Sequence, residues 1–129
     1  MDTSSQKEAC AKALEIMNKA SKNFARLNES QKAACLEAWQ KRLTLIQGPP
    51  GTGKTSTAIE IVRGWIYANP DATILVSAGT NVAADLLTEK LWTQGMRGVV
   101  RVGWDTNLDG NLPFVLKGVD ARDMVTHII

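Results

Sequence analysis

The chain has 129 residues, of which 44% are apolar and 22% charged, and its formal net charge is +2. This length suits one compact domain, and the composition excludes wholesale disorder. The weak positive charge does not by itself indicate nucleic-acid binding. Two cysteines exclude a disulfide scaffold, and with a single histidine they argue against a structural metal site.

The sequence also shows no targeting or membrane segment. No apolar run is long enough to cross a bilayer, and the first residues lack the basic start and apolar core of a signal peptide. We therefore expect an intracellular protein, located in the cytoplasm or nucleus, with no membrane partner.

The first predicted element is a helix over residues 4–22, because apolar residues recur there at helical spacing among good helix formers. Ser4 or Ser5 is the expected N-cap. Glu8 lies three residues past Ser5, which is the spacing of a capping box.

A second helix is predicted over residues 29–41, with Asn28 or Ser30 as its N-cap. The basic residues of this region are most simply read as a solvated helix face, with a weak nucleic-acid-binding face as the alternative. These residues are Lys7, Lys12, Lys19, Lys22, Arg26, Lys32, Lys41 and Arg42.

Strands and helices alternate in the middle of the chain. Short apolar runs at 43–46, 73–77 and 99–102 predict buried strands, and residues 54–68 and 81–94 have helical spacing between them. This order predicts an α/β fold with a parallel sheet and right-handed crossover helices. Asn69-Pro70-Asp71 and Gly95 are the expected stops of the two helices.

The motif that carries chemistry is Gly-Pro-Pro-Gly-Thr-Gly-Lys-Thr at residues 48–55, which fits the G-x-x-x-x-G-K-[ST] phosphate-binding loop, or Walker A motif. Its glycines let backbone N–H groups turn toward phosphate oxygens, and the helix that follows adds its N-terminal amides. Lys54 and Thr55 are the expected catalytic residues: the ammonium group reaches the β and γ phosphates, and the hydroxyl binds Mg²⁺. We assign nucleotide binding to the whole loop: Gly48, Pro49, Pro50, Gly51, Thr52, Gly53, Lys54 and Thr55.

Two further segments accompany this loop. Leu27-Asn28-Glu29-Ser30-Gln31 precedes it, and the stretch from Ala78 to Leu91 follows the second predicted strand. Together with the loop, they resemble three motifs of superfamily 1 helicases of the nonsense-mediated-decay type. The resemblance covers about residues 27–103.

This resemblance implies a P-loop NTPase of RecA-like fold that uses ATP and Mg²⁺. In the full-length protein it implies action on single-stranded nucleic acid, with RNA favoured over DNA although the sequence does not separate the two. It implies that Gln31 reads the adenine base, and that Thr80 and Asn81 contact the nucleic-acid backbone. Gly79 and Thr80 stand where the family usually has proline and serine. The alternative for Thr80 and Asn81 is a helix cap, and the alternative for Gln31 is a solvated surface position.

The family's Asp-Glu pair, which holds Mg²⁺ and positions water, has no counterpart here, because the sequence contains no Asp-Glu dipeptide. Its nearest imitation is the interrupted run from Phe114 to Asp120. We therefore expect an incomplete first motor domain in three parts: an N-terminal helical segment with the glutamine motif at 1–42, a partial RecA-like domain at 43–103, and a loop-rich, truncated end at 104–129. An incomplete sheet with an unpaired edge predicts marginal stability.

The resulting interpretation is the ATP-binding portion of an ATP-dependent RNA or DNA helicase, whose parent family is enzymatic. Three alternatives remain open. The first is a nucleotide-binding module that does not hydrolyse ATP. The second is another P-loop ATPase, of the AAA+ class. The third is a regulatory fragment that binds a partner through its N-terminal helices.

Several conspicuous side chains receive structural interpretations. The three tryptophans of the predicted helices are expected in the core: Trp39, Trp65 and Trp92. Trp104 follows a predicted strand and is expected to be more exposed to solvent. Cys10 and Cys35 are read as small packing residues, and His127 as incidental. Arg101 contacts phosphate or pairs with Asp85 or Asp105, and the sequence does not decide among these.

Overall fold

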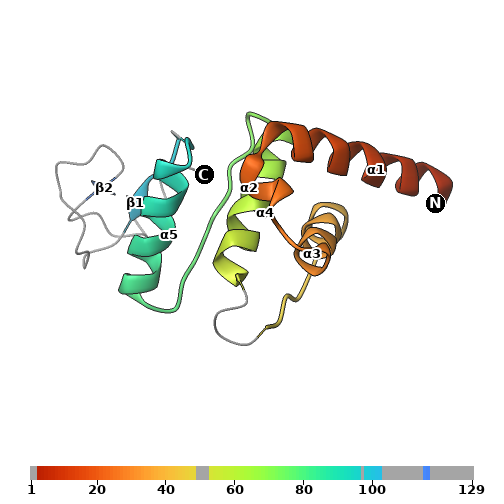
Figure 1. The fold of residues 1–129 in the computed structure, drawn as a ribbon. Coiled ribbons are helices and arrows are strands. Elements are labelled where there is room, and N and C mark those ends of the chain that lie inside the picture. The colour runs from red at the N-terminus through yellow and green to blue at the C-terminus, as the bar shows by residue number, and fades with distance from the viewer. Residues whose placement is uncertain (1–2, 49–52, 97, 103–114, 117–129) are drawn as a thin grey trace. The chain divides into compact units, whose positions relative to one another are not determined.

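The computed structural model describes residues 3–48, 53–96, 98–102 and 115–116 (Figure 1). It divides into two compact units, residues 1–74 and 75–129, and each is described by itself. The predicted boundaries at residues 42 and 103 stay predictions.

The described part of the first unit is helical. Its elements are α1 (Thr3–Ala20), α2 (Lys22–Ala25), α3 (Glu29–Gln40) and α4 (Lys54–Ala68). Helices α3 and α4 pack against each other, α1 contacts α2 and α3, and α2 also contacts α4. The second unit contains α5 (Asn81–Thr93), β1 (Arg101–Val102) and β2 (Val115–Leu116), with β1 and β2 paired in parallel.

The first predicted helix is interrupted at Ser21. Its hydroxyl oxygen accepts a hydrogen bond from the Phe24 amide at 3.1 Å and so caps α2. A serine that offers the backbone this local partner ends one helix and starts another, which helical periodicity does not reveal. The prediction of Ser4 or Ser5 as N-cap is wrong, because α1 already begins at Thr3.

The other three helices start and end close to their predicted bounds. Asn28 caps α3, while α4 covers the predicted residues 54–68. At the end of α5, Gly95 has a φ of 97°, and its amide and that of Met96 bond back to Trp92 and Leu91. This is a Schellman ending, which confirms the predicted stop at Gly95.

A small apolar core holds the first unit together. Phe24 and Cys35 are fully buried, and the core consists of Met17, Phe24, Cys35, Ala38 and Ile61, with Leu14, Leu27 and Trp39 packed against it. The structural interpretation of Cys35 is therefore confirmed, whereas the side chain of Cys10 lies outside the described residues. Burial raises the pKa of the Cys35 thiol to about 12, and the nearby charge of Glu60 adds to the rise.

Trp39 joins α3 to α4. Its indole nitrogen donates to the Ile61 carbonyl at 3.0 Å, and its ring lies 5.7 Å from that of Phe24. The indole passes so close to Gly64 that a Cβ on Gly64 would overlap it. Core packing is thus confirmed for Trp39 but wrong for Trp65, which is 38% exposed. Trp92 is half-buried, and Trp104 lies outside the described residues.

A buried carboxylate in α4, Glu60, links the helix junction at Ser21 to α4. Glu60 is 1% exposed, and both of its carboxylate oxygens accept from Arg63 Nε at 3.0 Å. The Ser21 hydroxyl donates to the same carboxylate. A buried carboxylate needs such partners, because removing one leaves its charge uncompensated.

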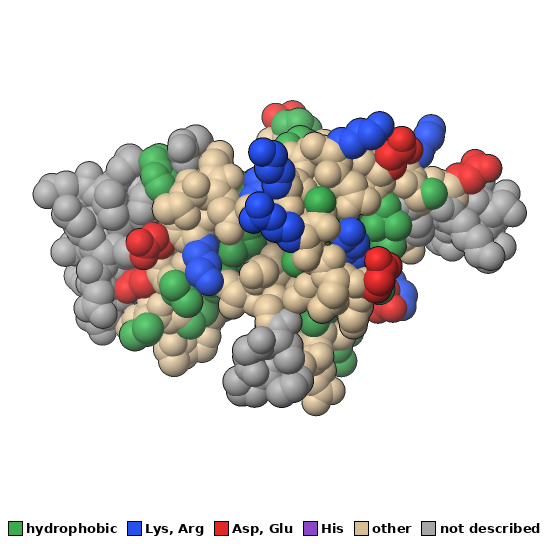
Figure 2. Space-filling view, in the orientation of Figure 1, with side chains coloured by type: hydrophobic (Ala, Val, Ile, Leu, Met, Phe, Trp, Pro, Cys, Tyr) green, Lys and Arg blue, Asp and Glu red, His purple; other side chains and the backbone are tan. Residues whose placement is uncertain are grey.

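The exposed charges of the N-terminal helices alternate in sign. Lys19 pairs with Glu15 and Lys41 with Glu37, each four residues apart and each solvent-exposed. Figure 2 shows basic and acidic side chains interspersed on this face, toward the N-terminal helices. Mixed signs favour the solvated-face interpretation, since nucleic-acid-binding faces cluster one sign.

The predicted sheet is only partly present among the described residues. The third predicted strand appears as β1, but residues 43–46 and 73–77 are not strands there. Their apolar side chains stay exposed, with Leu45 at 87% and Leu75 at 91%. A strand requires a hydrogen-bonded partner, so an apolar run alone does not make one. Strand β2 falls in the end that the sequence analysis treated as loop-rich.

Candidate nucleotide-binding site

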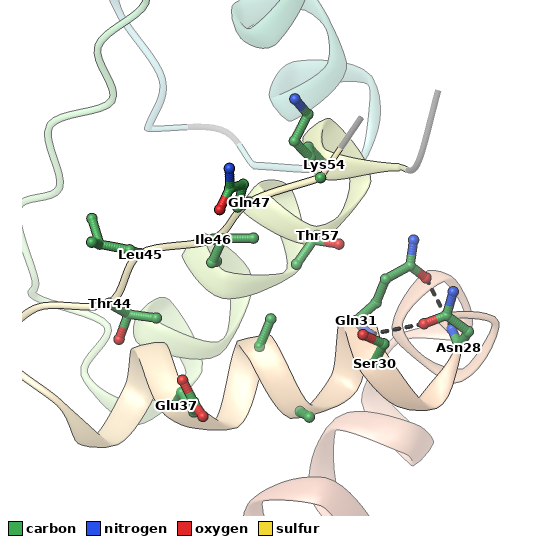
Figure 3. Close-up of a pocket in the computed structure, with 13 residues that line it drawn as sticks. Asn28, Ser30, Gln31, Glu37, Thr44, Leu45, Ile46, Gln47, Lys54 and Thr57 are labelled. Carbon is green, nitrogen blue, oxygen red and sulfur yellow. Dashed lines mark hydrogen bonds between the residues drawn. The ribbon is translucent and has the colours of Figure 1, made fainter. Parts of the chain in front are cut away.

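A pocket of about 530 Å³ opens in the first unit, within the range of ligand-binding clefts (Figure 3). It lies along α3, the segment that leads into the phosphate-binding motif, and the first turn of α4. Its lining residues are Asn28, Ser30, Gln31, Ala33, Ala34, Glu37, Thr44, Leu45, Ile46, Gln47, Gly48, Lys54 and Thr57. Three predicted nucleotide-binding residues therefore face one cavity: Gln31, Gly48 and Lys54.

Gln31 is held by the start of α3. Its backbone amide donates to Asn28 Oδ1 at 2.8 Å, and its side-chain Oε1 accepts from the Asn28 amide at 2.9 Å. This reciprocal pair is a capping box, drawn as dashed lines in Figure 3. Gln31 is half-buried, and its role in reading the base stays a prediction.

Gly53 immediately precedes α4 in the left-handed backbone region, with a φ of 80°. A Cβ at this position would lie 2.5 Å from Gln31 Nε2. Two constraints therefore require glycine here: the backbone conformation and the close approach of the Gln31 amide. The contact places the glutamine motif against the last glycine of the phosphate-binding loop.

Lys54 is the first residue of α4 and exposed, and Thr55 follows it, half-buried. The first amides of an α-helix have no intrahelical acceptor, and the helix dipole favours an anion at that end. The first turn of α4 thus fits a phosphate group. Pro49, Pro50, Gly51 and Thr52 lie outside the described residues.

The Thr55 hydroxyl suits Mg²⁺ as a single protein ligand. Mg²⁺ at nucleotide sites keeps several water ligands and takes the remaining oxygens from phosphates, so it needs few protein groups. Bound there, the ion would neutralise charge on the phosphates. Among the described residues, no group of three or more acidic, histidine or cysteine side chains forms a separate metal site.

Two pocket residues were missed by the sequence analysis. Thr57 is 2% exposed, and its hydroxyl donates to the Gly53 carbonyl at 3.0 Å, which ties α4 back to the glycine. Thr44 Oγ1 is buried and has no hydrogen-bond partner in the described part of the chain. A threonine inside a helix or an apolar run carries no sequence signal for either role.

The predicted nucleic-acid contacts lie in the second unit, at the start of α5. The Thr80 hydroxyl oxygen accepts from the Ala83 amide at 3.1 Å, so Thr80 is the N-cap. Asn81 is the exposed first residue of the helix. The structure also decides the partner of Arg101, whose Nε donates to Asp85 Oδ1 at 2.9 Å in a buried pair. Asp105 lies outside the described residues.

Comparison with known proteins identifies the family. A model described as an AAA domain, AAA_11, matches residues 26–122, which is most of the chain. The chain belongs to the AAA_11 family. This places it among P-loop NTPases, the coarser part of the predicted fold class.

The relatives of this AAA_11 chain carry helicase and nonsense-transcript names. ATP-dependent helicase NAM7 of Saccharomyces cerevisiae is 50% identical over 80 residues, 62% of this chain and 8% of the relative. The regulator of nonsense transcripts 1 homolog of Drosophila melanogaster is 49% identical over 103 residues, 78% of this chain and 9% of the relative. DNA polymerase alpha-associated DNA helicase A of Schizosaccharomyces pombe is 41% identical over 108 residues, 79% of this chain and 16% of the relative.

These matches confirm the resemblance to nonsense-mediated-decay helicases. The AAA_11 chain spans 8% to 16% of the lengths of these three relatives, so their activities describe much longer proteins. No solved structure matches the chain significantly. Across the described residues, no helix is long and apolar enough to cross a membrane.

Proposed function

We propose that this AAA_11 chain is the ATP-binding portion of an ATP-dependent helicase that acts on single-stranded nucleic acid. The observation that carries the proposal is the close approach of Gln31 to Gly53, beside a pocket that both Gln31 and Lys54 line. A base-reading side chain and a phosphate-binding helix start are the two halves of a nucleotide site. The relatives' printed names, which include ATP-dependent helicase, support the same function.

The phosphate half of the proposed site is the loop 48–55 and the first turn of α4. Lys54 compensates phosphate charge as a mobile ammonium on an exposed side chain. The α4 amides donate hydrogen bonds to phosphate oxygens, and Thr55 contributes its hydroxyl to Mg²⁺. Gly53 adopts the left-handed conformation that leads into α4, and its lack of a side chain leaves room for Gln31.

The base half is Gln31. Adenine presents an N–H donor and a ring-nitrogen acceptor side by side, and a glutamine amide complements both. Gln31 Oε1 already accepts from the Asn28 amide, but a carbonyl oxygen has a second lone pair for the adenine amino group. The capping box therefore orients the amide, which supports ATP over GTP.

The nucleic-acid contact is proposed at Thr80 and Asn81. The Thr80 oxygen accepts from Ala83, so its hydroxyl hydrogen remains a donor for a phosphate oxygen. Capping and phosphate binding are compatible at this residue. Hydroxyls, amides and helix starts are common phosphate contacts, and they read the backbone rather than the base sequence. We propose RNA rather than DNA as the preferred nucleic acid. We also propose that the protein is located in the cytoplasm or nucleus.

The finer fold is also part of the proposal. We propose that the apolar segments 43–46, 73–77 and 99–102 are strands of one parallel RecA-like sheet in the working enzyme. Their exposed side chains support this assignment, because leaving Leu45 and Leu75 in water forgoes the favourable free energy of burying apolar surface.

A second candidate applies to the 129-residue polypeptide itself: a module that binds ATP without hydrolysing it. The sequence observation behind it is the missing Asp-Glu pair. Hydrolysis needs an acidic group to hold Mg²⁺ and orient water, whereas binding needs only the phosphate loop and base contact.

The test is a calorimetric titration of the chain with ATP and Mg²⁺. Lys54→Ala should weaken binding at least about tenfold, the loss expected when one charge-assisted contact is removed. Lys19→Ala is the matched control, since Lys19 pairs with Glu15 on the exposed face of α1, away from the residues that line the pocket, and should leave affinity unchanged. Equal affinity for wild type and Lys54→Ala would refute the proposed site.

A further inference from the structure

Arg101 links the strand β1 to the first turn of α5. Its side chain is 6% exposed, and its Nε donates to Asp85 Oδ1 at 2.9 Å, with Asp85 itself 10% exposed at the side chain. Asp85 lies one helical turn after Asn81, so both face the same side of α5. The ion pair thus sits directly behind the proposed nucleic-acid contact.

The guanidinium also reaches Asn81. Its Nη2 lies 3.4 Å from Asn81 Oδ1, while Nη1 donates to the Val102 carbonyl. Arginine is a donor at every nitrogen and has no acceptor, so only the amide oxygen of Asn81 faces it favourably. The amide nitrogen of Asn81, with its two hydrogens, is then on the side away from Arg101.

We propose that Arg101, anchored by Asp85, is a positioning residue that holds the Asn81 amide with its N–H donors outward for a nucleic-acid phosphate. The inference rests on the proposed function, which assigns the phosphate contact to Asn81. Fixing the amide beforehand lowers the entropy lost on binding and removes the orientation in which the oxygen faces the phosphate. Arg101 itself does not touch the nucleic acid.

A purely structural role for Arg101 has a different signature. If the ion pair only fastens β1 to α5, substitutions of Arg101 and Asn81 affect RNA binding independently. If Arg101 acts through Asn81, its substitution has no further effect once the Asn81 amide is gone. A double-mutant cycle separates these cases.

The experiment measures binding of a short fluorescein-labelled polyuridine to the 129-residue chain by fluorescence anisotropy, at one fixed salt concentration. Arg101→Lys retains the charge and can pair with Asp85 but lacks the planar fork needed to hold Asn81 as well. We expect Asn81→Ala and Arg101→Lys each to weaken binding about threefold to tenfold, and the double variant to bind like Asn81→Ala alone. Affinity for ATP should be the same in all four proteins.

The outcomes separate this inference from the proposed function. Multiplicative losses in the double variant would overturn the positioning role while leaving the Asn81 contact intact. RNA binding that is unaffected by Asn81→Ala, or absent in the wild type, would refute the proposed nucleic-acid contact instead.

A second measurement covers the case in which Arg101→Lys fails to fold. In the wild-type chain, the Asn81 side-chain amide is identified in a ¹⁵N spectrum as the signal lost in Asn81→Ala. We expect its relaxation to report an ordered side chain, unlike the side chain of Asn18, which is exposed on α1. An Asn81 amide as mobile as a freely rotating one would overturn the inference whatever the binding data show.

Discussion

The side-chain nitrogen of Gln31 lies so close to Gly53 that a Cβ added to Gly53 would be only 2.5 Å from it. One residue belongs to the first turn of α3 and the other immediately precedes α4. Their contact brings the glutamine motif and the phosphate-binding loop to one pocket. Two independent constraints therefore require glycine at position 53: its left-handed backbone conformation and the lack of space for a Cβ beside Gln31.

Gly53→Ala tests this contact. The substitution puts a Cβ in the left-handed region and against Gln31, so we expect the free energy of unfolding to fall by about 1–3 kcal/mol. Urea denaturation followed by helical circular dichroism measures the loss. In a Gln31→Ala background the clash is removed but the backbone strain remains, so the same change should cost less. An equal cost in both backgrounds would mean that Gln31 does not press on Gly53.

Gly64→Ala tests the seam between α3 and α4. Alanine is normally favoured over glycine within a helix by about 1 kcal/mol. Here its Cβ would overlap the Trp39 ring and disturb the hydrogen bond from Trp39 to Ile61, so we expect net destabilisation of about 1–3 kcal/mol.

Gly98→Ala is the matched control for this change, because nothing lies within 4 Å of its added Cβ. We expect it to alter the free energy of unfolding by less than about 0.5 kcal/mol. A chain stabilised by Gly64→Ala would show that Trp39 does not occupy the place that the structure assigns to it.

The Cys35 thiol should be protected in the folded chain. Its pKa is raised to about 12, so at pH 9 only a small fraction is thiolate, whereas an ordinary cysteine is then about half ionised. In a Cys10→Ser variant, we expect Cys35 to react with a disulfide reagent at least about tenfold faster in urea than in buffer. Equal rates in the two solvents would contradict the burial of Cys35.

The same shift has a consequence for stability. Because the folded-state pKa lies above the ordinary value, the folded chain retains a proton that the unfolded chain loses as the pH rises above about 9. The stabilisation is complete below pH 9 and is lost as the pH rises toward 12. The urea midpoint should therefore decline over this window. In a Cys35→Ala variant, the decline from that variant's own midpoint at pH 8 should be smaller than in the wild type.

Local signals predicted the helices well. The bounds of α4 follow from the phosphate-binding loop on one side and Asn69-Pro70 on the other, and Gly95 ends α5 because only a left-handed residue fits there. The break at Ser21 was missed since a serine side chain competes with helix continuation without altering the apolar pattern.

Non-local features could not be predicted in the same way. Sheet pairing depends on a partner strand, so apolar runs at 43–46 and 73–77 predict strands that the described structure does not form. Within the site, the eight-residue motif is legible in sequence, but the approach of Gln31 to Gly53 is not. Likewise Arg101 had several possible partners, and only the fold selects Asp85.

The most direct test of one shared nucleotide site is to compare ATP with GTP, each with Mg²⁺, in wild-type, Gln31→Ala and Gln31→Glu chains. Glutamate at this position retains an oxygen for the capping box but lacks the amide donor, so it separates base reading from the start of α3. We predict that wild type prefers ATP by about tenfold and that both variants lose this preference. An unchanged preference for ATP in both variants would contradict the account, because Gln31 and the phosphate-binding loop would then not form one site.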